Sequence, residues 1–217
     1  MMIGVFSISP LDSNCLLDKT FNINKNSAKL YVEYKNKTKG LSEYYNSIIE
    51  EAKHEITVLC HHDVSLEYTN LNCLYEATKK FDVVGVAGGL NPKLVEKNLW
   101  HWMMGRENYR GIAAHTHPDG GMFLTNFGQT PSRVTLLDGV FLAFNTGKIK
   151  KSGARFDKQF LWHHYDIDFS LTCNYNKLKL GVWPILIYHE SPGLRDLDDK
   201  SWNNSNQKFI NKWQSKT

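Results

Sequence analysis

Strand-like and helix-like segments alternate through the first 90 residues, and this alternation restricts the possible folds more than any other feature of the sequence. Apolar runs typical of buried strands occupy residues 3–9, 29–34, 55–60 and 82–89. Between them lie a segment at 41–52, whose apolar residues recur with helical spacing, and a weaker helical segment at 70–80. This order indicates βαβ units. We therefore expect an α/β fold with a single open, mostly parallel twisted sheet flanked by helices.

The alternation is lost over residues 91–132, where tryptophans, glycines and the motif HTHPDGG predict an irregular region that lines a cleft. The pattern then predicts a strand at 135–144 interrupted by Asp138-Gly139, a short helix at 162–172, a strand at 178–188 and a final helix at 199–215. No repeat or flexible linker divides the sequence. We expect one domain over residues 1–217, a length that can bury a core of enzyme size.

The charge and the apolar runs exclude several functional classes. Lys and Arg number 26 against 22 Asp and Glu, and the basic residues are scattered apart from 148–151, so no nucleic-acid partner is expected. The longest apolar runs, at 83–90 and 181–188, are far shorter than the roughly 20 residues that span a bilayer, so we expect no transmembrane segment. The N-terminal segment lacks the features of a secretion signal, and the four cysteines form no CxxC pair. A cytoplasmic location fits these features.

The motif His61-His62-Asp63-Val64 follows a buried strand and is the first candidate for chemistry. In an extended chain residues 61 and 63 face the same side, so His61 and Asp63 can act on one ligand. A carboxylate here can bind a divalent ion that bridges phosphate oxygens, because such ions take few protein carboxylates when the substrate supplies phosphates. Alternatively, Asp63 caps a turn at the end of the strand.

Two acidic residues, Asp166 and Asp168, follow a histidine pair at the start of an expected helix. On a helix, side chains two positions apart point about 200° away from each other, so only one of the two can face a cleft. A carboxylate in a cleft is a candidate general base. The alternative is an acidic first turn that stabilises the N-terminus of the helix.

Two further polar residues accompany apolar strands. His189 follows the strand at 178–188 and could be a third metal ligand or a histidine of the turn. Because ligands bind at the carboxyl ends of strands in open α/β sheets, we expect His189 and Asp63 at the same rim. Asp138 lies within an apolar strand, where its burial is costly without a partner. It therefore either forms structural hydrogen bonds or contacts a ligand.

The middle region gives weaker signals. Trp100 and Trp102 could form a stacking wall for a sugar or a base, although a core position is the commoner fate of tryptophan. His115 and His117 have the spacing of a zinc HxH pair, but neither CxxC nor HExxH accompanies them. The GxxxxGK[ST] motif is missing, which excludes a Walker-type nucleotide hydrolase.

Five segments, taken in order, resemble the nucleotide-sugar glycosyltransferases related to glycosyltransferase family 2: KGLSEYYNSIIEEAKHEITVLCHHDV, DVVGVAGG, TLLDGVFLAF, FDKQFLWHHYDIDFSL and YHESPG. They resemble in particular a small glycosyltransferase-like subfamily in which HxDV replaces the usual DxD, and the likeness extends over most of residues 3–193. The resemblance implies a GT-A fold and a Mn²⁺ or Mg²⁺ cofactor. It also implies an inverting transfer from a nucleoside-diphosphate-sugar donor, with a UDP-sugar favoured, to a saccharide or other hydroxyl acceptor.

The resemblance assigns the nucleotide and metal side of the site to four residues. Asp63 corresponds to the metal-binding acid of DxD, and His61 takes the place of the first Asp. His189 falls where many GT-A enzymes have a metal-coordinating histidine. Asn46 matches an asparagine near the nucleotide. Residues 1–90 would form the nucleotide-binding half of the domain.

The acceptor and catalytic half would be residues 91–217. By the same resemblance, Asp166 corresponds to the acid that deprotonates the acceptor hydroxyl, and Asp138 lies in the DG strand that contacts the sugar. Trp100 and Trp102 would form a wall on the acceptor side.

Three positions depart from the family pattern. His61 replaces an Asp, Tyr165 stands where a Glu is expected, and Thr172 stands where an Arg is frequent. These departures motivate a non-enzymatic alternative, a catalytically degenerate sugar-nucleotide-binding domain. A further alternative is a metal-dependent hydrolase in which His61, His115, His117 and an Asp converge on one ion.

Overall fold

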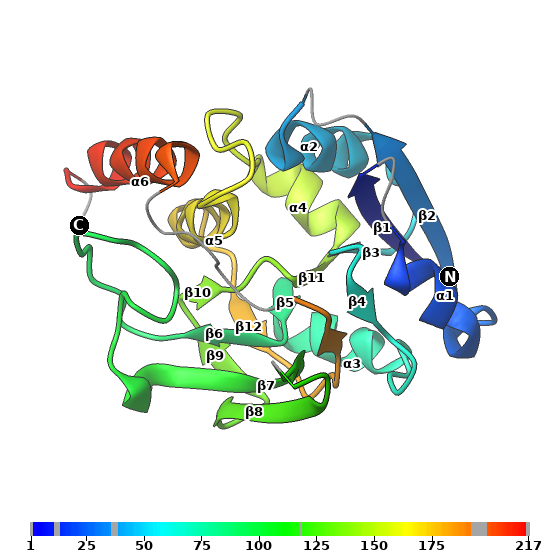
Figure 1. Ribbon diagram of the computed structural model, residues 1–217. Coiled ribbons are helices and arrows are strands. Elements are labelled where there is room, and N and C mark those ends of the chain that lie inside the picture. The colour runs from blue at the N-terminus through cyan, green and yellow to red at the C-terminus, as the bar shows by residue number, and fades with distance from the viewer. Residues whose placement is uncertain (1, 11–13, 36–38, 118, 192–198, 216–217) are drawn as a thin grey trace.

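The computed structural model describes residues 2–10, 14–35, 39–117, 119–191 and 199–215 (Figure 1). The helices are α1 (Leu16–Thr20), α2 (Leu41–Glu51), α3 (Cys73–Lys80), α4 (Thr146–Ser152), α5 (Tyr165–Tyr175) and α6 (Lys200–Trp213), with short 3-10 helices at Phe21–Asn24 and Arg106–Asn108. The strands are β1 (Ile3–Pro10), β2 (Ala28–Lys35), β3 (Ile56–Cys60), β4 (Val64–Ser65), β5 (Val83–Gly85), β6 (Ala87–Gly89), β7 (Tyr109–Thr116), β8 (Met122–Gly128), β9 (Ser132–Val134), β10 (Leu136–Leu137), β11 (Phe141–Asn145), β12 (Leu180–Val182) and β13 (Tyr188–His189). The chain therefore has the mixed α/β fold that the sequence predicts.

The first sheet has the strand order β2-β1-β3-β11-β5-β12-β9. β1 is parallel to β2 and β3, and β12 is parallel to β5, as βαβ units require. However, β11 lies between β3 and β5 and is antiparallel to both, so the prediction of a mostly parallel sheet is wrong at the centre of this sheet. A parallel neighbour requires a crossover of about a dozen residues. Only Val86 separates β5 from β6, so the chain passes directly into a second sheet and returns along β11 in the opposite direction.

The second sheet has the order β10-β6-β7-β13-β4, with β8 paired to β7, so the prediction of a single sheet is also wrong. Figure 1 shows β6, β7 and β8 on the side of the molecule opposite α2, α4 and α5. β7 and β8 form an antiparallel hairpin inside the region predicted to be irregular. The pattern of β8 hides this strand because Met122, Phe123 and Leu124 are all exposed, and an exposed edge strand needs no apolar alternation.

Three apolar runs connect the two sheets. The predicted strand at 82–89 divides into β5 and β6, the one at 135–144 into β10 and β11, and the one at 178–188 into β12 and β13. In the last of these, Pro184 lies between the two strands and lacks the N–H group that a ladder hydrogen bond requires. Val84, Leu137 and other buried residues of these runs belong to one continuous hydrophobic core.

The predicted helices at 41–52, 162–172 and 199–215 are confirmed as α2, α5 and α6. α2 buries Leu41, Tyr45 and Ile49 from its apolar stripe. Among the helices of the described segments, none combines the length and the apolar character needed to cross a membrane.

Candidate metal centre and adjoining cavities

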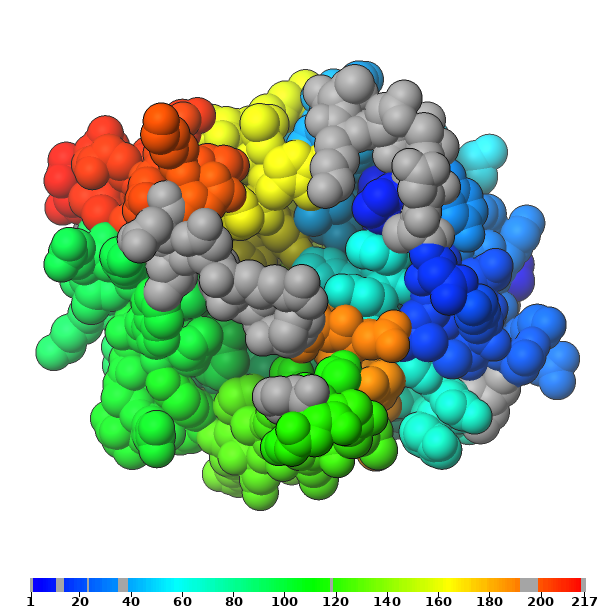
Figure 2. Space-filling view, viewed as in Figure 1, coloured from blue at the N-terminus to red at the C-terminus, as the bar shows by residue number. Residues whose placement is uncertain are grey.

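The pairing of β4 with β13 assembles a cluster of His61, Asp63 and His189. His61 and Asp63 lie between β3 and β4, and His189 on β13 stands opposite Val64 on β4. One potential ligand atom from each of the three side chains lies within 4.8 Å of the others. In Figure 2 the cyan segment between β3 and β4 and the orange segment of β13 reach the surface side by side. Asp63 and His189 thus lie together, as expected. The cause is the antiparallel pairing of β4 with β13 in the second sheet, whereas the expected cause was a shared edge of parallel strands.

The atoms of this cluster fit a metal ion. His189 Nε2 lies 3.3 Å from Asp63 Oδ1, and His61 Nδ1 lies 3.9 Å from the same oxygen. Ligand atoms about 2.1 Å from one ion are roughly 3.0–3.5 Å apart at octahedral or tetrahedral angles. Asp63 and His189 already have this spacing, and His61 would have to move closer to share the ion. Asp63 Oδ1 and His189 Nε2 are buried, and apart from each other neither has a hydrogen-bond partner among the described residues. Because buried polar atoms are rarely left unpaired, this cluster could hold a metal ion.

Opposing effects set the protonation of the cluster. Burial by itself raises the pKa of the Asp63 carboxyl, but the His189 and His61 rings outweigh burial and hold this pKa well below its usual range. Burial, together with the neighbouring His189 ring, lowers the pKa of His61 to about 4. At neutral pH Asp63 is therefore a carboxylate and His61 a neutral imidazole, which are the forms that bind metal ions.

Tyr165 at the start of α5 connects this cluster to an acidic site. Its hydroxyl oxygen lies 2.7 Å from His61 Nε2, the ring nitrogen that does not face Asp63. The next residue, Asp166, accepts a hydrogen bond of 3.1 Å from the backbone N–H of Gly139. The first turn of α5 therefore places one side chain against the metal cluster and the next against the turn that precedes β11.

Asp138 and Trp100 complete the acidic site. The two carboxylate oxygens of Asp138 accept hydrogen bonds from the Trp100 indole N–H at 2.7 Å and from the Val140 backbone N–H at 2.9 Å. Asp138 thus has structural partners, yet it also lines a cavity together with Asp166. Burial, reinforced by the nearby Asp138 carboxylate, raises the pKa of Asp166 to about 7. A carboxyl with such a pKa can both accept and release a proton near neutral pH.

Two cavities adjoin the contact between His61 and Tyr165. One of about 180 Å³ is lined by residues that include Trp100, Asp138 and Asp166. The other, of about 250 Å³, lies at the end of β1 and is lined by Ile8, Ser9, Pro10, Leu41, Tyr45, His61, His62, Trp162 and Tyr165. His61, Trp162 and Tyr165 line both. The candidate metal centre thus adjoins one cavity that holds carboxylates and another at the carboxyl end of β1.

Two predicted binding residues lie outside these cavities. The Asn46 side chain bonds both backbone groups of Phe156, donating to its carbonyl oxygen at 2.8 Å and accepting from its N–H at 2.9 Å. Asn46 thereby fixes the loop before α5 and lines neither cavity. Trp102 is 39% exposed and, unlike Trp100, does not line the cavity of the carboxylates.

The remaining acidic and histidine candidates separate in space. Asp168 is fully buried and accepts hydrogen bonds from Trp213 Nε1 at 2.8 Å and from Lys212 Nζ at 3.0 Å, which attaches α6 to α5. His115 stands beside His189 on the neighbouring strand β7, with ring centroids 6.2 Å apart. His117 instead lies 3.2 Å from Asp119. Among the described residues, the group placed to share an ion contains His61, Asp63 and His189, without His115 or His117.

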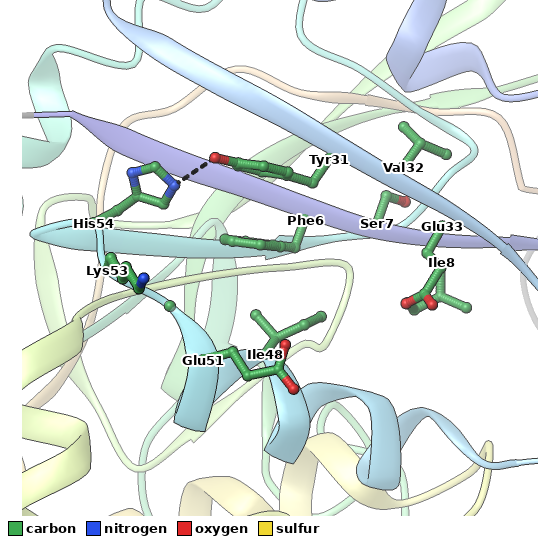
Figure 3. Close-up of a pocket in the computed structure, with 11 residues that line it drawn as sticks. Phe6, Ser7, Ile8, Tyr31, Val32, Glu33, Ile48, Glu51, Lys53 and His54 are labelled. Atoms are coloured by element: carbon green, nitrogen blue, oxygen red, sulfur yellow. Dashed lines mark hydrogen bonds between the residues drawn. The ribbon is translucent and has the colours of Figure 1, made fainter.

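A larger cavity, of about 540 Å³, lies between β1, β2 and the end of α2. Figure 3 shows Phe6 and Tyr31 stacked on one side of it, with the Tyr31 hydroxyl group bonded to His54. None of the candidate metal ligands or acidic residues described above lines this cavity. Its size therefore does not mark it as the centre of the chemistry.

Comparisons with known proteins bear on the fold. No protein-family model matches the chain, and no curated protein matches it. The crystal structure of S. aureus TarS has a TM-score of 0.55 and 12% sequence identity, covering 88% of this chain and 37% of that chain. A197 from STIV has a TM-score of 0.49 and 11% identity, covering 92% of this chain and 100% of that chain. The fold resembles GT-A structures. At such identity the likeness to TarS shows the fold alone, and this chain spans little more than a third of TarS.

No direct signal in the sequence marks Tyr165 and Trp162 as residues of the site. Tyr165 is noticeable only because it replaces an expected Glu next to Asp166. In the structure it contacts His61 and lines both cavities, and Trp162 also lines both. An aromatic residue beside a candidate base could have been a signal, but aromatic residues are frequent in cores and the pattern alone does not separate the two cases.

Proposed function

We propose that this protein is a metal-dependent glycosyltransferase. It moves a sugar from a nucleoside-diphosphate-sugar donor to an acceptor hydroxyl, with inversion at the anomeric carbon. The proposal rests on one observation. On a fold that resembles GT-A structures, a candidate metal cluster lies beside a cavity lined by a candidate general base. His61, Asp63 and His189 are placed to hold a cation, and Asp166 lines the cavity beside them.

The donor side of the proposal rests on the metal cluster and the cavity at the end of β1. Asp63, His61 and His189 would hold Mn²⁺ or Mg²⁺, which when bound neutralises the charge that develops on a leaving diphosphate. His61 also lines the cavity of about 250 Å³, so a nucleotide there would have its phosphates near the cluster. Residues 1–90 supply most of the lining of this cavity, and a UDP-sugar is the favoured donor.

The acceptor side of the proposal rests on Asp166. Its pKa of about 7, raised by burial and by Asp138, suits a general base that takes the proton of an attacking hydroxyl group. The hydrogen bond from Gly139 fixes this carboxylate, and the bond from Trp100 fixes that of Asp138. In this proposal Asp138 would contact the transferred sugar, and Trp100 would lie on the acceptor side.

The decisive experiment measures sugar transfer and donor hydrolysis with a panel of UDP-, GDP-, ADP- and dTDP-sugars, each with Mn²⁺, Mg²⁺ or a chelator. We expect one nucleotide class to be turned over only with a divalent ion. Asp63→Ala should abolish the metal-dependent binding of that nucleotide and leave the fold intact, because the Asp63 side chain is 28% exposed and lies outside the hydrophobic core. Asp119→Asn, whose side chain is 88% exposed, is the matched carboxylate control and should behave as the wild type. Full Mn²⁺-dependent nucleotide affinity in Asp63→Ala would refute the metal assignment.

One observation favours a second candidate, a metal-dependent hydrolase. Two histidines and one carboxylate are a ligand set that catalytic zinc sites use, and His61, Asp63 and His189 make up such a set. Tightly bound zinc in the purified protein, with no response to sugar nucleotides, would favour the hydrolase. A weakly held, exchangeable Mn²⁺ favours the transferase. Nucleotide binding without any donor hydrolysis or transfer would instead identify a degenerate binding domain.

A further inference from the structure

His61 and Tyr165 are hydrogen-bonded to each other, and both side chains line the two cavities of the proposed site. Tyr165 is buried, and its hydroxyl group lies 2.7 Å from His61 Nε2. The phenol ring packs against Tyr45 and Phe156, with ring centroids 5.8 and 6.2 Å away, and these two rings also contact each other at 5.3 Å. A ring packed in this way has little freedom to turn, so its hydroxyl group is a fixed partner for the imidazole.

The backbone at Gly139 leaves room for the Tyr165 hydroxyl group. A side-chain carbon on Gly139 would collide with the Tyr165 hydroxyl and would lie 2.8 Å from Cβ of Asp166. Glycine at this turn therefore allows the start of α5 to approach β11 closely. The position of Tyr165 is set by α5, by the aromatic residues around it and by this turn, and not by His61 alone.

The two ring nitrogens of His61 face different partners. Nε2 faces Tyr165, and Nδ1 lies on the side of Asp63, 3.9 Å from Oδ1. A neutral imidazole carries one proton, so one nitrogen donates while the other offers a lone pair. If Nε2 donates to the Tyr165 oxygen, the lone pair of Nδ1 is directed toward Asp63 and His189, where a cation would lie. A histidine that binds a metal almost always donates its other N–H group in this way.

We infer that Tyr165 is the positioning residue of the metal centre. It accepts a hydrogen bond from His61 Nε2–H, which fixes the ring and its tautomer so that Nδ1 is the ligand atom. The inference rests on the proposed function only in requiring that the cluster binds a metal ion. It further implies that the Tyr165 hydroxyl proton points away from His61 when the metal is bound, toward the cavities that this residue lines.

The test uses Tyr165→Phe in the full chain, with Mn²⁺ alone as the probe. Loss of an outer partner of a metal-binding histidine typically weakens metal affinity about 10–100-fold. We expect a loss of that size in Tyr165→Phe, measured by Mn²⁺ binding in electron paramagnetic resonance. Tyr31→Phe is the matched control, since it removes the same kind of hydrogen bond between a tyrosine and a histidine, to His54 at 2.9 Å, in the cavity that none of the candidate residues lines. It should keep the wild-type Mn²⁺ affinity.

A second measurement does not depend on the folding of the variant. In the wild type with Zn²⁺, the ¹⁵N spectrum of the histidine rings should show His61 protonated at Nε2 and bound through Nδ1. Coordination through Nε2, or equal Mn²⁺ affinity in Tyr165→Phe and the wild type, would overturn the inference while leaving the metal site in place. A wild type that binds neither ion would overturn both this inference and the proposed metal centre. Metal binding with the predicted tautomer but without sugar transfer would overturn only the proposed function.

Discussion

At the scale of single residues, two acids only two positions apart have different environments. Asp166 lines the cavity beside the metal cluster, whereas Asp168 is fully buried against Lys212 and Trp213. Since a helix turns about 100° per residue, only one of the pair can face the cavity, as expected from their spacing. The general-base proposal therefore concerns Asp166, and Asp168 serves to attach α6.

Replacing Asp166 with Asn should lower transfer at least about a hundredfold, the lower range for a lost general base. It should also change how stability depends on pH. Burial, followed by the Asp138 carboxylate, raises the pKa of Asp166 from 3.8 to about 7, so the folded protein binds this proton more tightly than the unfolded chain. The stability that this proton contributes is complete below pH 4 and is lost as the pH rises through 7. The Asn variant has no such proton and does not lose this stability. The Tm of the variant minus the Tm of the wild type should therefore be larger at pH 8 than at pH 5.

Thermal melts of both proteins at the two pH values check this expectation. A Tm difference that is the same at pH 5 and pH 8 would contradict the assignment of a raised pKa to Asp166. Asp119→Asn, in an exposed loop, should show no such dependence relative to the wild type.

Replacing His189 with Ala should weaken Mn²⁺-supported activity more than Mg²⁺-supported activity. Imidazole is a suitable ligand for Mn²⁺, whereas Mg²⁺ prefers oxygen. The measurement is the ratio of the two activities in the wild type and the variant. His115→Ala is the control, because the His115 ring adjoins His189 but lies outside the cluster. An unchanged ratio in His189→Ala would remove His189 from the metal site.

At the scale of elements, the start of α5 and the turn at Asp138-Gly139 form one unit. The Gly139 N–H binds Asp166, and the same glycine leaves room for the Tyr165 hydroxyl group. The metal cluster depends on a second pair of elements, β4 and β13. Neither pair is close in sequence, so the site is built where separate elements meet.

Replacing Gly139 with Ala should therefore damage both parts of the site. The added methyl group would displace the start of α5, and with it the contacts of Tyr165 and Asp166. We expect Mn²⁺ affinity to fall about tenfold or more, as for loss of an outer partner of a metal ligand, and transfer to fall with it. Gly147→Ala in α4 is the control, since a methyl group there meets only Asn145 Oδ1 at an ordinary 3.5 Å. Wild-type Mn²⁺ affinity in Gly139→Ala would show that the close approach of α5 is not needed.

At the scale of the whole molecule, the two sheets cannot be divided at residue 90. β5 belongs to the first part of the chain, but both of its neighbours in the sheet, β11 and β12, come from the second part. The nucleotide and acceptor halves proposed for the site are therefore functional regions that share one sheet and one core.

A fragment of residues 1–90 should not fold by itself. Without β11 and β12, the apolar strand β5 has no partner, and β3 presents an open edge. We expect circular dichroism of the fragment to show no cooperative thermal transition, in contrast to the full chain. A cooperative transition with strand content in the isolated fragment would show that the first three strands and α2 suffice.

The sequence by itself determined the elements whose causes are local. Periodicity identified α2, α5 and α6, and the apolar runs identified β1, β2 and β3, because side-chain spacing within one segment decides which face it buries. The residue types also named the metal candidates His61, Asp63 and His189, since carboxylates and imidazoles at the ends of strands are chemically suited to that role.

Only the tertiary structure decided how those segments meet. The antiparallel position of β11, the hairpin of β7 and β8, and the pairing of β4 with β13 are set by contacts between segments far apart in the chain. A local pattern records that a strand is buried, but not which neighbour buries it or in which direction that neighbour runs. For the same reason the sequence could not show that Asn46 bonds the backbone of Phe156, or that Tyr165 contacts His61.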